Sequence, residues 1–146
     1  MKTHNGVNQL KQDSGVTRHS GTELLNLIMA YSISTAVRAA AQLDLADLMK
    51  DGPKTVEALA QASRTQASHL QRILRVLCAH RVFKEQPPNT YQLDELGWNL
   101  CSDSPSRLKE AALMLTDQSF LHCAGDLSQA ASGIPIFKER FGHAFF

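Results

Sequence analysis

The stretch over residues 22–42 constrains the fold most, because it is predicted to be a helix that is apolar nearly all the way round. Thr22 is a suitable N-cap, and Glu23 and Arg38 are the charged residues of the stretch. A helix of this kind has to be buried on several sides, and in so short a chain a partner subunit is the expected cover. The residues expected at this dimer interface are Leu24, Leu25, Ile28, Tyr31, Ile33 and Val37.

A membrane span is disfavoured for the same stretch. Polar side chains interrupt it and carboxylates follow it at once, at Asn26, Ser32, Ser34, Thr35, Asp44 and Asp47. We therefore expect the helix to be covered by protein rather than by lipid.

Length, charge and cysteine content narrow the class of protein. With 146 residues, 43% apolar and 20% charged, the chain has room for one domain with a sizeable core. Its net charge of +1 gives no bulk attraction to nucleic acid or anionic membranes. The three cysteines lack C-x-x-C spacing, which predicts reduced thiols and a cytoplasmic protein. Residues 1–21 have no apolar signal-peptide run and are expected to form a flexible arm ahead of a helical domain over 22–146.

A helix–turn–helix followed by a hairpin is predicted within residues 53–104. Thr55 caps one helix over 56–62, and a second, long helix over 66–80 carries apolar residues at helical spacing. Two alternating segments then flank a proline-rich turn. The fold class expected is mainly α, a winged-helix-like helical domain with a small two-stranded β wing. Further helices are expected over 43–49, over 95–100 with Asp94 as its cap, over 106–115 and over 118–131.

The basic residues of this module raise the possibility of DNA binding. They are Arg64, Arg72, Arg75, Arg81 and Lys84. A basic recognition helix can enter the major groove while a wing contacts phosphate. However, acidic residues surround the patch and the proline-rich turn gives the wing no positive tip. Nucleic acid is therefore not the expected partner, and a DNA-binding transcription regulator stays an alternative. The alternative role for Arg72 and Arg75 is pairing with an adjoining domain.

Histidines and cysteines do not form a recognisable catalytic or metal-binding pattern. His69 and His80 are eleven residues apart on one helix, and His122 and His143 lack the spacing of a zinc site or a catalytic triad. We expect catalytic residues, cofactor ligands and metal ligands to be absent from this chain.

Taken in order, several motifs resemble the N-terminal dimerisation domain of small-molecule O-methyltransferases, whose members methylate plant phenolics and bacterial polyketides. The similarity extends over residues 22–146. The motifs that carry it are Gly52-Pro53-Lys54-Thr55-Val56-Glu57-Ala58-Leu59-Ala60, Leu70-Gln71-Arg72-Ile73-Leu74-Arg75-Val76-Leu77, Val82-Phe83-Lys84-Glu85, Tyr91-Gln92-Leu93, Leu96-Gly97, Ser132-Gly133-Ile134-Pro135-Ile136-Phe137 and Gly142. The resemblance implies an intertwined homodimer in which this domain caps the acceptor pocket.

The sequence departs from the family pattern at two turn positions. Arg64 stands where a glycine is usual, and we expect a different turn there; Asp94 stands where a threonine is usual and is expected to cap equally well. The resemblance also implies an S-adenosylmethionine (SAM) cofactor and an α/β domain with a glycine-rich loop and a general-base histidine. The eight glycines of this chain never form a G-x-G pair. The chain alone is therefore expected to be inactive.

The chain ends within the aromatic segment 141–146, which suggests separation from a cofactor domain, either by a cut between domains or as a product that needs a separate partner. A stand-alone adaptor or pseudoenzyme subunit is a further alternative. The resemblance places the following residues as candidates for the wall of an aromatic acceptor pocket: Met114, Phe120, His122, Phe137 and Tyr31.

Overall fold

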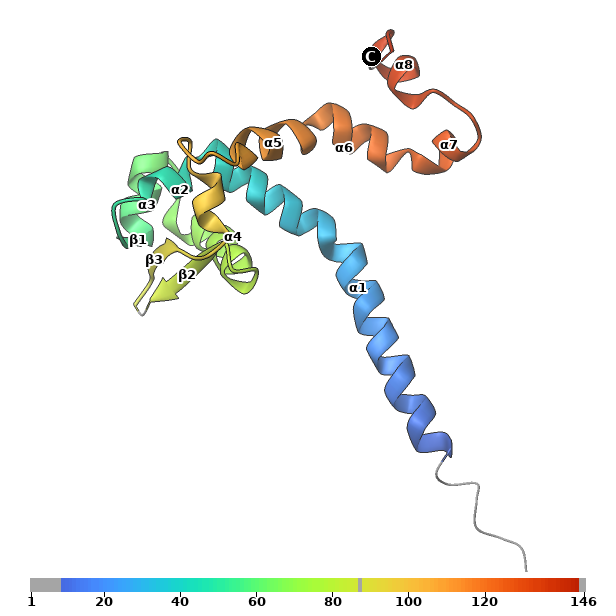
Figure 1. The fold of residues 1–146 in the computed structure, drawn as a ribbon, viewed down its shortest axis with the longest axis horizontal. Helices are drawn as coiled ribbons and strands as arrows, with labels where there is room; N and C mark the ends of the chain where they lie inside the picture. The colour runs from blue at the N-terminus through green and yellow to red at the C-terminus, as the bar shows by residue number, and fades with distance from the viewer. Residues whose placement is uncertain (1–8, 87, 145–146) are drawn as a thin grey trace, which may run out of the picture. The chain divides into compact units, whose positions relative to one another are not determined.

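The protein is mainly helical, with a small three-stranded sheet (Figure 1). The structure, a computed structural model, describes residues 9–86 and 88–144, with the side chains of the first helix described from Ser20 onward. The helices are α1 (Gln9–Gln42), α2 (Leu45–Leu48), α3 (Val56–Ser63), α4 (Ala67–Ala79), the 3-10 helix η1 (Gly97–Leu100), α5 (Leu108–Leu115), α6 (Gln118–Gly125), α7 (Leu127–Ala131) and α8 (Ile136–Phe141). The strands are β1 (Lys54–Thr55), β2 (Phe83–Gln86) and β3 (Thr90–Leu93).

The chain divides into two compact units, Met1–Ile33 and Ser34–Phe146. The described part of the first unit is the N-terminal stretch of α1. The second unit holds the last residues of α1 and all the other helices and strands.

Helix α1 begins earlier than the sequence suggested. It starts at Gln9, so Thr22 lies inside the helix instead of capping it, and the expected arm over 1–21 is helical from residue 9. Gly15 and Gly21 weaken a helix but do not end it, since glycine keeps its backbone N–H and fits helical dihedral angles. The rest of the expected arm, residues 1–8, lies outside the described residues.

The predicted helix–turn–helix and hairpin are present in the expected order as α3, α4, β2 and β3. Thr55 caps α3 by accepting a hydrogen bond from the backbone N–H of Ala58 at 3.2 Å. Leu70, Leu74 and Leu77 of α4 are buried at the predicted helical spacing. Together with residues of α2, α3 and the sheet they form the core, whose largest fully buried members also include Leu45, Met49, Leu59, Phe83 and Tyr91.

The sheet has one strand more than predicted. Strand β1 pairs antiparallel with β3, in the register Lys54 to Tyr91 and Thr55 to Thr90, and β2 pairs with the other side of β3. The expected two-stranded hairpin is present as β2 and β3, and β1 was not predicted because a two-residue strand next to a Gly-Pro turn is too short to show alternation. The added strand holds the start of α3 against the hairpin, because the N–H of Val56 donates to the carbonyl of Asn89 at 2.9 Å.

Two other helix predictions also need correction. The segment 95–100 forms a turn and the 3-10 helix η1, although Asp94 does accept a hydrogen bond from the N–H of Glu95 at 2.8 Å. The helix expected over 118–131 is divided at Asp126 into α6 and α7. Asp126 has a non-helical backbone and its carbonyl accepts bonds from the N–H groups of Gln129 and Ala130, which starts a new helix.

Candidate functional site

Helix α1 presents apolar side chains that nothing in the described part of the chain covers. Residues 20–31 are all exposed, and Leu24, Leu25, Ile28 and Tyr31 are between 56% and 62% exposed. By length and composition alone, Ser20–Gln42 is apolar enough to cross a membrane. Contiguous apolar surface of this kind marks an interaction site in most proteins.

Ile33 and Val37, which were also predicted for the dimer interface, are less exposed than the other four residues. Ile33 is half-buried, and Val37 is half-buried against the core of the second unit. Val37 also lines an apolar groove of about 250 Å³, with Val82, Leu96, Asn99, Leu100, Leu108 and Ala112. Leu96 and Leu108, which line this groove, are each about half exposed.

Arg38, a charged residue near the end of α1, contacts the later helices. Its guanidinium donates a hydrogen bond to the carbonyl of Leu113 and another to Oγ1 of Thr116, at 3.3 Å. It also lies 3.6 Å from a carboxylate oxygen of Asp117. These contacts connect α1 to the α5–α6 joint, the short segment between the end of α5 and the start of α6. From the sequence, Arg38 was identified only as one of the two charged residues of 22–42; its place as the one basic residue of that stretch was the signal that could have singled it out.

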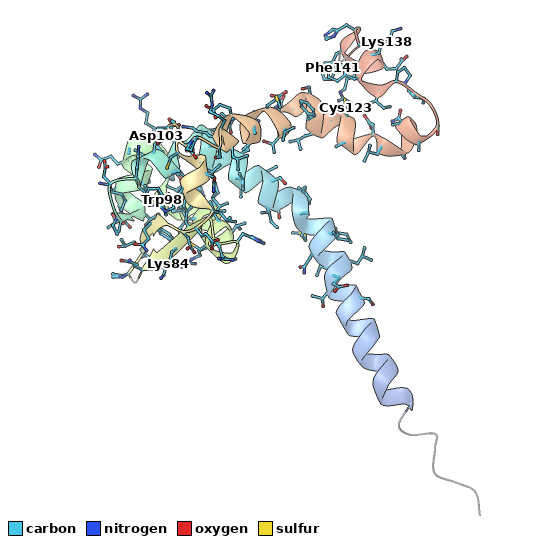
Figure 2. All side chains as sticks on the ribbon, viewed as in Figure 1. Lys84, Trp98, Asp103, Cys123, Lys138 and Phe141 are labelled. Carbon is cyan, nitrogen blue, oxygen red and sulfur yellow. The ribbon has the colours of Figure 1, made fainter. Side chains whose placement is uncertain are left out.

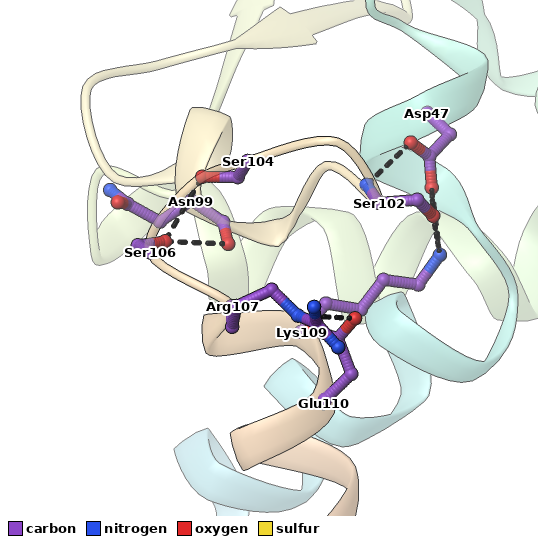
Figure 3. A network of polar contacts seen from close by, with 8 residues as sticks. All are labelled: Asp47, Asn99, Ser102, Ser104, Ser106, Arg107, Lys109 and Glu110. Atoms are coloured by element: carbon purple, nitrogen blue, oxygen red, sulfur yellow. Dashed lines mark hydrogen bonds and ion pairs between the residues drawn. The ribbon is translucent and has the colours of Figure 1, made fainter.

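A second polar network fixes the start of α5 (Figure 3). The ammonium group of Lys109 lies 2.6 Å from Asp44, 2.7 Å from Asp47 and 2.6 Å from the hydroxyl of Ser102. Ser102 in turn donates to Asp47 from its backbone N–H at 2.8 Å and from its hydroxyl at 2.7 Å. The network therefore ties α5 to α2 and to the loop that follows η1.

This network shifts the pKa values of its members. Burial favours the neutral form of Asp47, but hydrogen bonds from Lys109 and Ser102 outweigh it and hold the pKa below the ordinary 3.8. Burial also opposes the charge on Lys109, yet the carboxylates of Asp44 and Asp47 raise its pKa above the ordinary 10.5. Both groups are charged at neutral pH, and the pair is structural.

Asp47, Cys101 and Asp103 bring potential metal ligand atoms within 4.8 Å of one another. However, Lys109 binds the carboxylate of Asp47, and Lys50 binds that of Asp103. Burial, reinforced by both carboxylates, raises the pKa of the Cys101 thiol, so the metal-binding thiolate is disfavoured. The cluster is accounted for by its two ion pairs.

The other thiols and the basic patch have ordinary surroundings. All three cysteines are free. Burial and the nearby Glu85 raise the pKa of Cys78 to about 11, so it is a poor nucleophile at neutral pH. Of the basic residues considered for DNA, Arg81 pairs with Glu95, and Arg72 and Arg75 are exposed on α4.

The five candidates for an acceptor pocket are distributed over α1, α5, α6 and α8. Met114 is exposed on α5, Phe120 and His122 lie on α6, and Phe137 lies on α8. The ring centres of Phe137 and Phe141 lie 4.7 Å apart with the rings tilted by 43°, and the ring of His143 meets Phe137 edge-on at 5.6 Å. Figure 2 shows the side chains of these helices, with Cys123 of α6 and Phe141 of α8 labelled. Tyr31 belongs to the first unit. The assignment of these five residues to one pocket stays a prediction.

The fold has clear relatives of known activity. Residues 25–103, more than half of the chain, match the family model described as the O-methyltransferase dimerisation domain. The phenazine O-methyltransferase of Lysobacter antibioticus is 31% identical over 123 residues, which cover 84% of this chain and 36% of that protein. The 8-amino-8-demethylriboflavin N,N-dimethyltransferase of Streptomyces davaonensis is 29% identical over 129 residues, 85% of this chain and 37% of that protein. The chain thus spans little more than a third of the length of these curated relatives.

Solved structures agree with the sequence relatives. A methyltransferase of calicheamicin biosynthesis, in its SAH-bound form, matches with a TM-score of 0.75 and 35% identity over 86% of this chain and 38% of that chain. Human N-acetylserotonin methyltransferase in complex with SAM shares the fold at 21% identity, with a TM-score of 0.76 over 98% of this chain and 40% of that chain. These matches confirm the family expected from the sequence motifs. The chain therefore belongs to the O-methyltransferase dimerisation-domain family.

Proposed function

We propose that this chain forms a homodimer through α1 and caps the acceptor pocket of a SAM-dependent methyltransferase that modifies a small aromatic hydroxyl compound. The observation that carries the proposal is the exposed apolar surface of α1, in a domain whose family is defined by dimerisation. Removing such apolar surface from water contributes about 25 cal/mol per Å², against which the entropy cost of association is set.

A second copy of the chain is a better cover for α1 than a lipid bilayer. Ala36, Ala40 and Ala41, at the C-terminal end of the candidate span, are already buried in the chain's own core, and Arg38 is bound to Leu113. Residues 20–35 are then left for lipid, fewer than the roughly 20 residues that a span needs. We propose a protein partner in the cytoplasm.

The acceptor class follows from the side chains and from the relatives. The names of two relatives specify a phenazine and a riboflavin derivative, both flat fused-ring compounds. Met114, Phe120 and Phe137 are the types of side chain that pack against flat rings, since methionine is deformable and phenylalanine stacks. We propose that they face the acceptor.

Methyl transfer needs the acceptor oxygen aligned with the methyl group of SAM, which is a matter of positioning two bound molecules. The chain lacks a G-x-G motif, and we propose that a SAM-binding domain other than residues 1–146 holds the cofactor. The chain supplies assembly and part of the pocket wall, and it does not methylate by itself.

Sedimentation velocity tests the assembly. At micromolar concentration the chain is expected to sediment as a dimer. A monomer at that concentration contradicts the proposed interface.

A chimera tests the capping role. Residues 1–146 replace the matched N-terminal part of the Lysobacter antibioticus phenazine O-methyltransferase, and transfer of labelled methyl groups from SAM to its phenazine acceptor is measured. The natural enzyme and its isolated SAM-binding part are the controls. We expect turnover by the chimera and none by the chain alone. A dimeric, SAM-binding chimera without turnover contradicts capping and favours an adaptor, and turnover by the chain alone contradicts the separate cofactor domain.

A further inference from the structure

Arg38 occupies the joint where α5 ends and α6 begins, although it is more than 70 residues away in sequence. Its side chain is 20% exposed, whereas that of Asp117 is 49% exposed. The contacts to the Leu113 carbonyl and to the Thr116 hydroxyl are both partly buried. The ion pair to Asp117 is at the surface, where such pairs contribute little.

The carbonyl groups at the end of α5 show why Arg38 is needed there. The last carbonyls of a helix have no partner within the helix. The carbonyl of Ala112 is bound by the N–H of Thr116 at 3.2 Å and by its hydroxyl at 2.5 Å, and that of Met114 by the N–H of Asp117 at 3.1 Å. The carbonyl of Leu113 is bound by Arg38. A cation at this end of a helix is also favoured by the helix dipole.

The same guanidinium faces the start of α6. Asp117 caps that helix, and its Oδ1 accepts from the N–H of Ser119 at 3.0 Å and from the Ser119 hydroxyl at 2.8 Å. Its other oxygen, Oδ2, is the one that faces Arg38. One side chain of α1 is therefore in contact with the end of one helix and the cap of the next.

We propose that Arg38 is a positioning residue, which fixes the α5–α6 joint on α1 and so sets where Met114 and Phe120 stand. Met114 lies in the last turn of α5 and Phe120 in the first turn of α6, so a rotation at the joint moves both. Their role in acceptor binding rests on the proposed function, but the anchoring by Arg38 does not. Because Arg38 belongs to the helix that forms the proposed dimer interface, it links assembly to the shape of the acceptor pocket.

Hydrogen exchange of the intact chain tests the anchoring. Arg38→Ala is expected to speed exchange of the amides over 116–121 about tenfold or more, since the partly buried carbonyl of Leu113 loses its charged donor. Arg38→Lys keeps the positive charge and the aliphatic part of the side chain but reaches fewer acceptors. Its exchange rates are therefore expected to lie between those of the wild type and of Arg38→Ala. Arg72→Ala, at an exposed position of α4, is the control and leaves these amides unchanged. Unchanged exchange over 116–121 in both Arg38 variants overturns the proposal, as does an equal increase in β2 and β3.

The acceptor kinetics of the chimera distinguish a positioning residue from one that only stabilises the fold, because loss of stability alone does not change the KM for the acceptor selectively. We expect Arg38→Ala to raise the KM for the phenazine acceptor severalfold with the KM for SAM unchanged, and Arg38→Lys to recover part of the loss. Equal changes in both KM values contradict positioning. A wild-type chimera without turnover counts against the proposed function, while the exchange experiment still decides whether Arg38 anchors the joint.

Discussion

At the scale of single residues, Gly97 is the glycine, among those that the structure describes, at which an added Cβ atom has least room. A Cβ atom there would stand 2.2 Å from the carbonyl oxygen of Val82, which accepts a hydrogen bond from the N–H of Asp94. We predict that Gly97→Ala lowers the free energy of unfolding by about 2 kcal/mol or more, because the backbone has to shift and that hydrogen bond weakens.

Urea unfolding of matched alanine variants measures this effect. At Gly125, among the described residues, nothing lies within 4 Å of an added Cβ, so Gly125→Ala is the control. It is expected to be neutral or to stabilise by up to about 1 kcal/mol. Equal midpoints for the two variants count against a steric role for Gly97.

Arg64 adopts the left-handed conformation, with φ 55° and ψ 42°. It follows α3 in the geometry that favours glycine, with the N–H of Thr65 bound to the carbonyl of Ala60 at 2.9 Å. We predict that Arg64→Gly raises the free energy of unfolding by about 0.5–1 kcal/mol, because the Cβ strain disappears.

The same substitution within a helix supplies the contrast. Arg72→Gly in the interior of α4 is expected to lower the free energy of unfolding by about 1 kcal/mol. Thermal unfolding of both variants checks the opposite signs, and a loss of stability at both positions contradicts the account of Arg64.

At the scale of elements, the start of α5 depends on the charge state of Asp47. Its lowered pKa means that ionised Asp47 stabilises the folded chain above the ordinary pKa of 3.8, and that this contribution is lost as pH falls through the lower folded value. The raised pKa of Lys109 has the opposite sense, with stabilisation present below 10.5 and lost as pH rises beyond it.

We predict that Asp47→Asn lowers the free energy of unfolding at pH 7 by about 1–2 kcal/mol and makes the loss of stability toward acid pH shallower. Urea midpoints between about pH 3 and pH 7 measure both effects. Asp51→Asn, an exposed carboxylate close to Asp47 in sequence, is the control. A parallel acid dependence in wild type and Asp47→Asn shows that other carboxylates account for it.

Elements with local signals were predictable from the sequence. The apolar spacing of α4 and the Thr55 cap depend on neighbours within a few residues, and both are present. Strand β1 was missed because its partner, β3, lies far along the chain. The break at Asp126 and the 3-10 geometry of η1 involve local backbone hydrogen bonds that the apolar periodicity does not encode.

In the candidate site, too, features with a local sequence signal were predictable and long-range contacts were not. Exposure of Leu24, Leu25 and Ile28 followed from a helix too apolar for one small domain to cover. The anchors Arg38 and Lys109 were missed, because their partners at Leu113 and Asp47 are brought close only by tertiary folding. Long-range polar contacts leave no repeating pattern in a sequence.

At the scale of the whole molecule, the proposed dimer makes stability depend on protein concentration. A partner that binds the folded state raises the midpoint of thermal unfolding as its concentration increases. For a self-association through α1, dilution from about 500 to about 5 µM is expected to lower the Tm by several degrees.

Charged variants on α1 separate this effect from intrinsic stability. Leu25→Glu combined with Ile28→Glu places carboxylates in the proposed interface, and glutamate is a good helix former, so the exposed helix itself is preserved. We predict that this variant sediments as a monomer and that its Tm no longer changes with concentration. Val76→Glu, on the partly exposed face of α4, is the control and keeps the concentration dependence. Burying two carboxylates at a contact surface costs desolvation free energy, so a dimer formed through α1 has to be weakened by the double substitution. If the Tm depends on concentration equally in both variants, the dimer contact therefore lies elsewhere than on α1.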